Sequence, residues 1–228
     1  MTSAGALSAL ARVTLTRTLR KKTLWVAGVI ALLPALFAVS VGAHHSVIST
    51  ADDVFNVAKI LLGIIPPVFV AAAIGEEIED RTATYLWSRP LARWTVIVGK
   101  LLALVPLVMV LMAASWLVPA ALVLHYDKLA MPSLVLAAGG TAVAMTSAGI
   151  ASLVPKHGMA LTIIYVLADL TIGALPTSIA KLSMTYHVGA LVSRQVDAHD
   201  KWMSAIALAA IAGAWLAAGL RRIRRAEV

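Results

Sequence analysis

Six long apolar runs constrain this chain more than any other feature of its sequence. Each has about 17 residues or more, the length of α-helix that crosses the hydrocarbon core of a bilayer. The runs cover residues 24–43, 54–75, 95–124, 132–154, 159–175 and 202–220. Only 13% of the residues are charged, against about 25% in soluble domains. We therefore predict an all-α integral membrane protein, with a single transmembrane domain over residues 1–228 and six transmembrane helices.

Basic residues beside these runs predict the orientation of the chain, because cytoplasmic flanks of membrane spans are enriched in Lys and Arg. With the N-terminus in the cytoplasm, fourteen of the 19 basic residues lie on that side and four lie outside. The fourteen are Arg12, Arg17, Arg20, Lys21, Lys22, Arg81, Arg89, Arg93, Lys100, Lys156, Arg221, Arg222, Arg224 and Arg225. Both termini are therefore predicted to be cytoplasmic. The net charge of +8 is explained by topology, and we expect no nucleic-acid partner.

Small residues and prolines predict how the spans pack. Helices in lipid associate where small residues let their backbones approach closely. Two stripes at intervals of four are candidate packing seams: Gly140, Ala144, Ala148 and Ser152, and Ala205, Ala209, Gly213 and Ala217. Prolines inside the first three spans predict kinks at Pro34, Pro66, Pro67, Pro106 and Pro119.

A dense charged segment separates the second and third apolar runs. Within it, Ala83, Leu86 and Trp87 share one face of a short amphipathic helix that ends near Pro90. The acidic residues Glu76, Glu77, Glu79 and Asp80 come just before this helix. An anionic membrane surface would repel four acids, so we predict that this cytoplasmic segment meets a partner protein.

The acidic cluster, Thr82, the pattern Pro90-x-x-Arg93 and the pair Gly99-Lys100 together resemble the cytoplasmic loop of ABC-2-type transporter permeases. The basic N-terminal segment and the six-span layout also resemble that family. Arg81 stands where the family commonly has glycine.

The resemblance implies an ABC-2 fold similar to that of type V exporters. It implies a connecting helix over 1–23, a coupling-helix loop over 76–93 and an extracellular, re-entrant-like region over 176–200. The residues that it assigns to coupling are Glu76, Glu77, Glu79, Asp80, Arg81, Thr82, Tyr85, Leu86, Trp87, Arg89, Pro90 and Arg93.

The resemblance also implies the partners and the location. They are two ABC ATP-binding subunits and a second copy of this permease, which form an exporter in the bacterial cytoplasmic membrane, also called the inner membrane. ATP and Mg would be bound by the partner, since this sequence has no G-x-x-x-x-G-K-[ST] motif. We therefore expect no cofactor and no enzymatic activity in this chain.

Lys59 and Asp169 are the clear charges at membrane depth. Charges at membrane depth face the protein interior, pair with each other or serve transport. Counted from the outer ends of their spans, both residues are roughly 8–9 Å deep. A structural pair is the first hypothesis. A role in substrate or proton movement and separate solvation in an outer cavity are the alternatives.

Two other functions and a metal site are alternatives to transport. Asp169 with a surface histidine would suit an intramembrane enzyme, and an ATP-driven anchor or assembly subunit would use the same fold as a permease. The acidic and histidine residues of the outer loops have no diagnostic metal-ligand spacing, so we expect no metal. Those residues are His44, His45, Asp52, Asp53, Asp197, His199 and Asp200.

Overall fold

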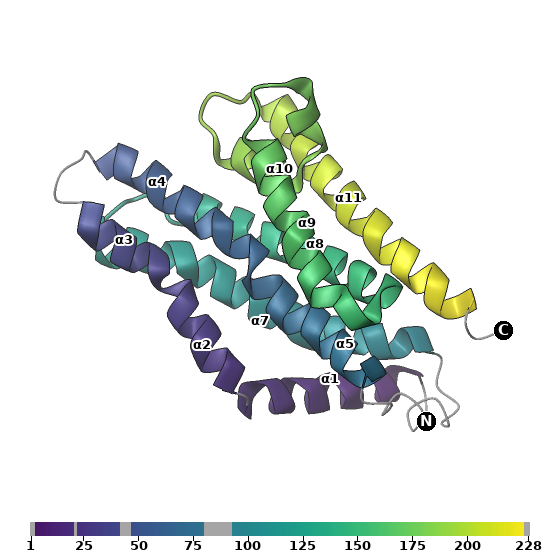
Figure 1. Cartoon of the computed structure of the whole chain (residues 1–228). Helices are drawn as coiled ribbons and strands as arrows, with labels where there is room; N and C mark the ends of the chain where they lie inside the picture. Colours follow the sequence, from purple (N-terminus) through teal and green to yellow (C-terminus); the bar gives the residue numbers. More distant parts are fainter. Residues whose placement is uncertain (1–2, 21, 42–46, 80–92, 226–228) are drawn as a thin grey trace.

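The computed structural model describes residues 3–20, 22–41, 47–79 and 93–225, and every regular element in them is helical. The elements are α1 (Ser3–Arg20), α2 (Lys22–Ala31), α3 (Leu33–Val41), α4 (Val47–Ile60), η1 (Leu61–Gly63), η2 (Pro67–Ala71), α5 (Ala72–Glu79), α7 (Arg93–Leu122), α8 (Ala130–Leu153), η3 (Pro155–His157), α9 (Gly158–Gly173), η4 (Ser178–Leu182), α10 (Met184–Val192) and α11 (Ala198–Arg225). Figure 1 shows the long helices gathered into one bundle.

Five helical segments among the described residues are long and apolar enough to cross a membrane. They are Lys22–Val41, Val47–Gly75, Trp94–Leu122, Ala130–Leu153 and Ala198–Arg225. The all-helical part of the prediction is confirmed, and these segments correspond to five of the six predicted spans.

The remaining predicted span, 159–175, corresponds to α9, which has only 16 residues. At 1.5 Å per residue it extends about 24 Å, less than the roughly 30 Å of a hydrocarbon core. Its outward side chains are apolar, since Leu161, Ile164 and Leu167 are exposed. The count of six spans stays a prediction.

The helix α8 lies at the centre of the bundle. It packs against α7 and α11, and also contacts α9 and α10. In the most apolar stretch of α8, 78% of the residues are buried, whereas in that of α11 only 22% are buried. The exposed side chains of α11 include Trp202, Met203 and Ile206. A surface this apolar suits a lipid solvent and would be unusual in water.

Prolines change the helices in only some of the predicted places. The second span passes through the 3₁₀ turn η1 and the π-helix η2 on either side of Pro66, so regular α-helical bonding is lost there. The first span breaks at Leu32, just before Pro34, where α2 gives way to α3. In contrast, α7 continues as one helix through Pro106 and Pro119.

The small-residue seam predicted in α8 is real, whereas the one predicted in α11 is wrong for packing within the chain. A Cβ atom at Gly140 would lie 2.8 Å from Cγ of Met112, so glycine lets α7 approach α8. Gly213 has no atom within 4 Å of such a position. The side of α11 that packs carries Leu208, Ala212 and Gly219 instead, because spacing alone does not say which face of a helix meets a neighbour.

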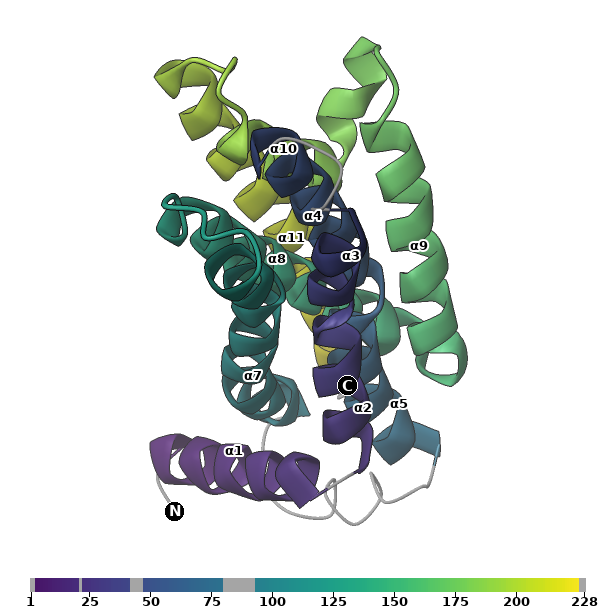
Figure 2. The ribbon, with the colours of Figure 1, turned by 90° about the vertical axis from the view of Figure 1, so that its left-hand side faces the viewer.

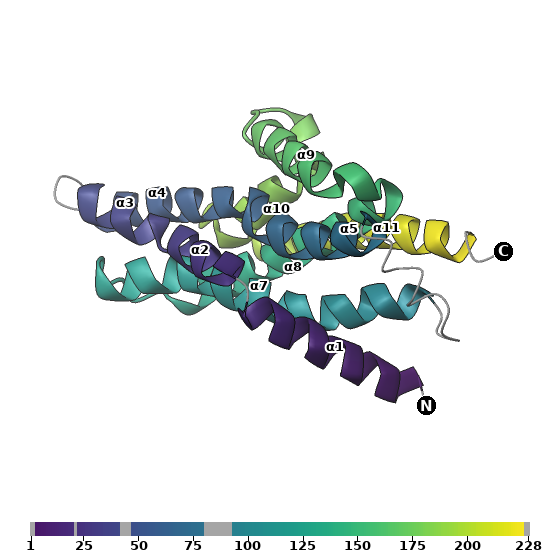
Figure 3. The ribbon, with the colours of Figure 1, turned by 60° about the horizontal axis from the view of Figure 1, so that its bottom comes forward.

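At one end of the bundle, α1 lies across the ends of the other helices instead of joining them (Figures 1 and 2). With the bottom of the molecule turned toward the viewer, α1 lies next to the first part of α7 (Figure 3). The two helices pack against each other. The C-terminal end of α11 points toward the same end of the bundle. The end of α5 and the start of α7 also lie there, and we call this the α1 end.

Candidate coupling end and transport path

The structure describes part of the predicted coupling loop. Glu76, Glu77 and Glu79 lie in the last two turns of α5, and Arg93 is the first residue of α7. The other eight predicted coupling residues lie outside the described residues: Asp80, Arg81, Thr82, Tyr85, Leu86, Trp87, Arg89 and Pro90. The predicted short amphipathic helix falls in the same undescribed stretch, so both assignments stay predictions.

Gly99 and Lys100, near the start of α7, contact α1 and α5 respectively. A Cβ atom at Gly99 would lie 3.3 Å from Cβ of Leu10 and 3.7 Å from the carbonyl oxygen of Leu7. Glycine at this position therefore allows α1 to lie directly against α7. The Lys100 side chain is only 4% exposed and donates a hydrogen bond to the carbonyl oxygen of Ala73 in α5. One short segment of α7 thus contacts both α1 and α5.

Three acids lie in the last described turns of α5. Glu76, Glu77 and Glu79 carry negative charge there, and no basic residue lies in the last described turn. A cationic partner would complement this charge.

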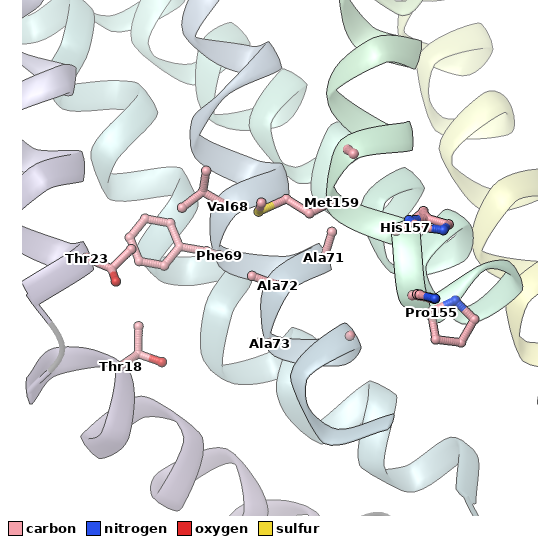
Figure 4. Close-up of a pocket in the computed structure, with 14 residues that line it drawn as sticks. Thr18, Thr23, Val68, Phe69, Ala71, Ala72, Ala73, Pro155, His157 and Met159 are labelled. Carbon is pink, nitrogen blue, oxygen red and sulfur yellow. The ribbon is translucent and has the colours of Figure 1, made fainter. Parts of the chain in front are cut away.

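A cavity of about 470 Å³ opens between the elements at the α1 end. Figure 4 shows Thr18 of α1 and Thr23 of α2 on one side, and His157 and Met159, from η3 and α9, on the other. Between them, η2 and α5 supply Phe69 and small alanines. The wall of this cavity thus includes the helix that leads directly into the predicted coupling loop.

The carboxylate of Asp169 is bound by the N-terminus of α10. Its two oxygens accept hydrogen bonds from the backbone N–H groups of Met184 and Thr185 and from the hydroxyl of Ser183, each at 2.9 Å. The residue is 5% exposed. A helix N-terminus carries partial positive charge and free N–H donors, so it compensates a buried carboxylate.

Ser183 and Thr185 extend this cluster to the backbone of α9. The Thr185 hydroxyl donates to the carbonyl oxygen of Asp169 at 3.1 Å, and the single proton of the Ser183 hydroxyl is shared between this carbonyl, at 2.9 Å, and the Asp169 carboxylate. Ser183 also caps α10 by accepting from the N–H of Tyr186 at 3.1 Å. A Cβ atom at Gly173 would come within 2.6 Å of the Ser183 hydroxyl oxygen, so this close approach requires glycine.

Lys59 lies beside the other end of the same helix. Its Nζ atom is 3.8 Å from the position that a Cβ atom would take at Gly189, in the last turn of α10. No ion pair joins Lys59 to Asp169, although the structure describes both residues in full. The two charges instead flank α10, the acid at its positive end and the base toward its negative end. Direct pairing stays a prediction.

Sequence reasoning singled out Asp169 but missed the residues that bind it. The available signal was Ser183, a preferred N-cap residue directly before an apolar segment. Its side-chain partner is 14 residues earlier on another helix, a separation that local pattern does not reveal.

The residues predicted to lie in the first outer loop, and considered as metal ligands, do not all lie in a loop. Asp52 and Asp53 belong to α4, which begins at Val47, and not to a loop. His44 and His45 lie outside the described residues. Within the described ranges, no group of three or more His, Cys, Asp or Glu side chains is arranged to hold a metal ion.

Comparison with protein-family models and with curated proteins finds no match to this chain. The case for its function therefore depends on the sequence resemblance and on the geometry of the α1 end.

Proposed function

We propose that this chain is the transmembrane subunit of an ABC-2-type transporter, acting as an exporter in a bacterial cytoplasmic membrane. In this proposal two copies of the chain work with two ATP-binding subunits. The helix α1 is the connecting helix, residues 76–93 form the coupling-helix loop, and the α1 end faces the cytoplasm. The helix α9 is then the sixth span.

The observation that carries the proposal is the meeting of α1, α5 and α7 at one end of the bundle. Gly99 and Lys100, two residues of the motif that resembles ABC-2 permeases, make the contacts to Leu10 and Ala73. A force on the segment between α5 and α7 would therefore move α1 and two spans together. That is the mechanical property a coupling loop needs.

The cavity at the α1 end fits the same proposal. It is bounded by α5 on one side and by α9 on another, so a displacement of α5 would change its width. In alternating access, such a cavity opens and closes as packed helices move against one another. The ATP-binding subunits would supply the energy, and this chain the path.

The three glutamates at the end of α5 point to the chemistry of the partner. Because Glu76, Glu77, Glu79 and Asp80 place four acids within five residues, a basic groove on an ATP-binding subunit would complement their charge. Complementary charge across an interface also fixes its register and excludes wrong partners.

Charge reversal tests the proposal directly. The chain, tagged after Val228, is purified from cell membranes in mild detergent, and ATP hydrolysis of the purified material is measured. We expect the double variant Glu77→Lys, Asp80→Lys to lose about tenfold or more of the co-purifying ATPase, the effect of roughly 1.4 kcal/mol of lost binding.

The matched control is Asp197→Lys, Asp200→Lys, which reverses the same number of acids on the predicted outer side. It should retain the ATPase. Equal ATPase in the parent chain and both variants, or none in any of them, would contradict the proposal. Transport of a defined substrate by the active complex then separates an exporter from an ATP-driven anchor.

A further inference from the structure

A second cavity, of about 520 Å³, lies at the end of the bundle opposite α1. We call it the outer cavity. Its walls come from α4, α7, α8, α10, the start of α11 and the loops between residues 123–129 and 193–197. Its volume falls within the roughly 300–1,000 Å³ of sites that hold small molecules. None of the residues that resemble the ABC-2 loop lines it.

Three aromatic rings form one wall of the outer cavity. Trp116 packs edge-on against Phe55, with ring centroids 5.9 Å apart, and against Tyr126, with centroids 6.1 Å apart. Apolar side chains such as Met131 and Leu191 continue the wall. This lining suits an apolar chain or ring.

Trp116 carries a buried hydrogen-bond donor without an acceptor. The side chain is 2% exposed, and its Nε1 has no partner among the described residues. Buried indole N–H groups usually find an acceptor. Because the Nε1 atom is itself buried, this donor lies behind the cavity wall, and Trp116 contributes to the outer cavity as part of the aromatic lining.

The charged side chains of the outer cavity are mostly basic. Lys128, Arg194 and Lys201 line it together with a single acid, Asp52. Lys59 lies just beyond the lining, with its Nζ atom next to Gly189, which does line the cavity. The described carboxylates form no ion pair with any of these four cations. Arg194 instead donates to the Tyr126 hydroxyl, which holds its guanidinium at the aromatic wall.

The geometry points to the outer cavity as a binding site for an amphiphilic anion, a molecule with a negatively charged headgroup and an apolar chain or ring. The headgroup lies among Lys59, Lys128, Arg194 and Lys201, and the apolar part lies on Phe55, Trp116 and Tyr126. A cationic ligand would meet an excess of positive charge, so the aromatic wall does not serve as a cation-binding cage. An anionic lipid of the outer leaflet and a free amphiphilic anion share this chemistry.

Binding to the purified full-length chain, without any ATP-binding subunit, tests the inference independently of the proposed function. In the first arm, thermal unfolding in neutral maltoside detergent is followed with added octyl phosphate. Octyltrimethylammonium and octyl glucoside serve as the cationic and neutral comparisons. In the second arm, the delipidated chain is mixed with equal amounts of phosphatidylglycerol and phosphatidylcholine, and bound lipid is counted by native mass spectrometry.

We expect octyl phosphate alone to raise the unfolding temperature if the source is a free anion, and selective retention of phosphatidylglycerol if it is a lipid. Either result, or both, supports the inference. Lys59→Met, Lys128→Met and Trp116→Phe should each weaken the effect about five- to tenfold, the scale of one lost charge-assisted or buried contact.

The matched controls are Lys181→Met and Trp202→Phe, which change the same residue types outside the cavity lining and should bind as the parent does. Variants are compared only as monodisperse protein, so a failure to fold is not read as a failure to bind. Equal responses to anion, cation and neutral ligand, together with equal retention of phosphatidylglycerol and phosphatidylcholine, would overturn the inference. Unchanged binding in the Lys128→Met or Trp116→Phe variant would overturn it as well.

Discussion

At the scale of single residues, the hydrogen bonds to Asp169 explain how this chain tolerates a buried carboxylate. The charge is met by two backbone N–H groups and a serine hydroxyl at the start of α10. Hydrogen bonds to an ionised acceptor are roughly twice as strong as neutral ones. Lys59, beside the last turn of the same helix, has a sign that suits the opposite end of the helix dipole. Both charges are thus arranged around α10.

Replacing Asp169 with Asn should destabilise the protein more than replacing other acids does. The amide has one acceptor oxygen where the carboxylate has two, so at least one buried N–H of α10 loses its partner. Such a loss costs about 1–3 kcal/mol. Thermal unfolding of the purified chain in detergent measures it, with the exposed Asp127→Asn as the control that should unfold like the parent.

A double-mutant cycle shows whether Lys59 and Asp169 interact directly. Since the structure contains no ion pair between them, the stability losses of Lys59→Met and Asp169→Asn should add within about 0.5 kcal/mol in the double variant. A coupling energy well above that value would mean that the pair predicted from the sequence forms in another state of the protein.

At the scale of elements, two glycines set how closely α8 and α11 approach. A Cβ atom at Gly149 would overlap the carbonyl group of Trp215, and one at Gly219 would lie 2.9 Å from Cα of Gly149. The backbones of the two helices therefore touch at this crossing. In lipid, where apolar burial gives little net driving force, close packing of this kind holds helices together.

The same pair of helices provides a matched test. Gly149→Ala should force α8 and α11 apart and destabilise the protein by about 1–3 kcal/mol, the usual cost of overpacking. Gly213→Ala, in α11 with open space around it, should leave stability unchanged or raise it slightly, since alanine is the better helix former. Unfolding temperatures of the two variants check this, and similar destabilisation by both would refute the assigned contact face.

At the scale of the whole molecule, the apolar runs predicted the helical bundle and five of its long helices. The spacing of small residues could not predict which side of α11 packs against α8, because the stripe through Gly213 and the stripe through Gly219 are both rich in small residues. The sequence pattern also could not predict that the N-terminus of α10 binds Asp169, since this contact joins distant parts of the chain. In contrast, Gly99 and Lys100 were found by motif, and the structure adds the contacts to α1 and α5 that explain their residue types.

The orientation of the molecule can be tested with single-cysteine variants, because the chain itself contains no cysteine that a thiol reagent would label. Lys181→Cys lies in η4, at the end opposite α1, and Arg222→Cys lies near the end of α11. The basic residues at the α1 end predict that this end is cytoplasmic. A membrane-impermeant maleimide should label Lys181→Cys in intact cells and label Arg222→Cys only after permeabilisation. Labelling of both sites in intact cells would reject the predicted orientation.

The contact between Leu10 and Gly99 has a consequence for how the protein is made. Leu10 leaves the ribosome first, and Gly99 follows about 5–20 s later at common rates of synthesis. During that interval α1 has no α7 to lie against. Its composition suits a temporary place on the lipid surface, because Val13, Leu15 and Leu19 are exposed alongside three arginines. We therefore expect α1 to reach its final position only after α7 has been made, although α1 is synthesised well before it.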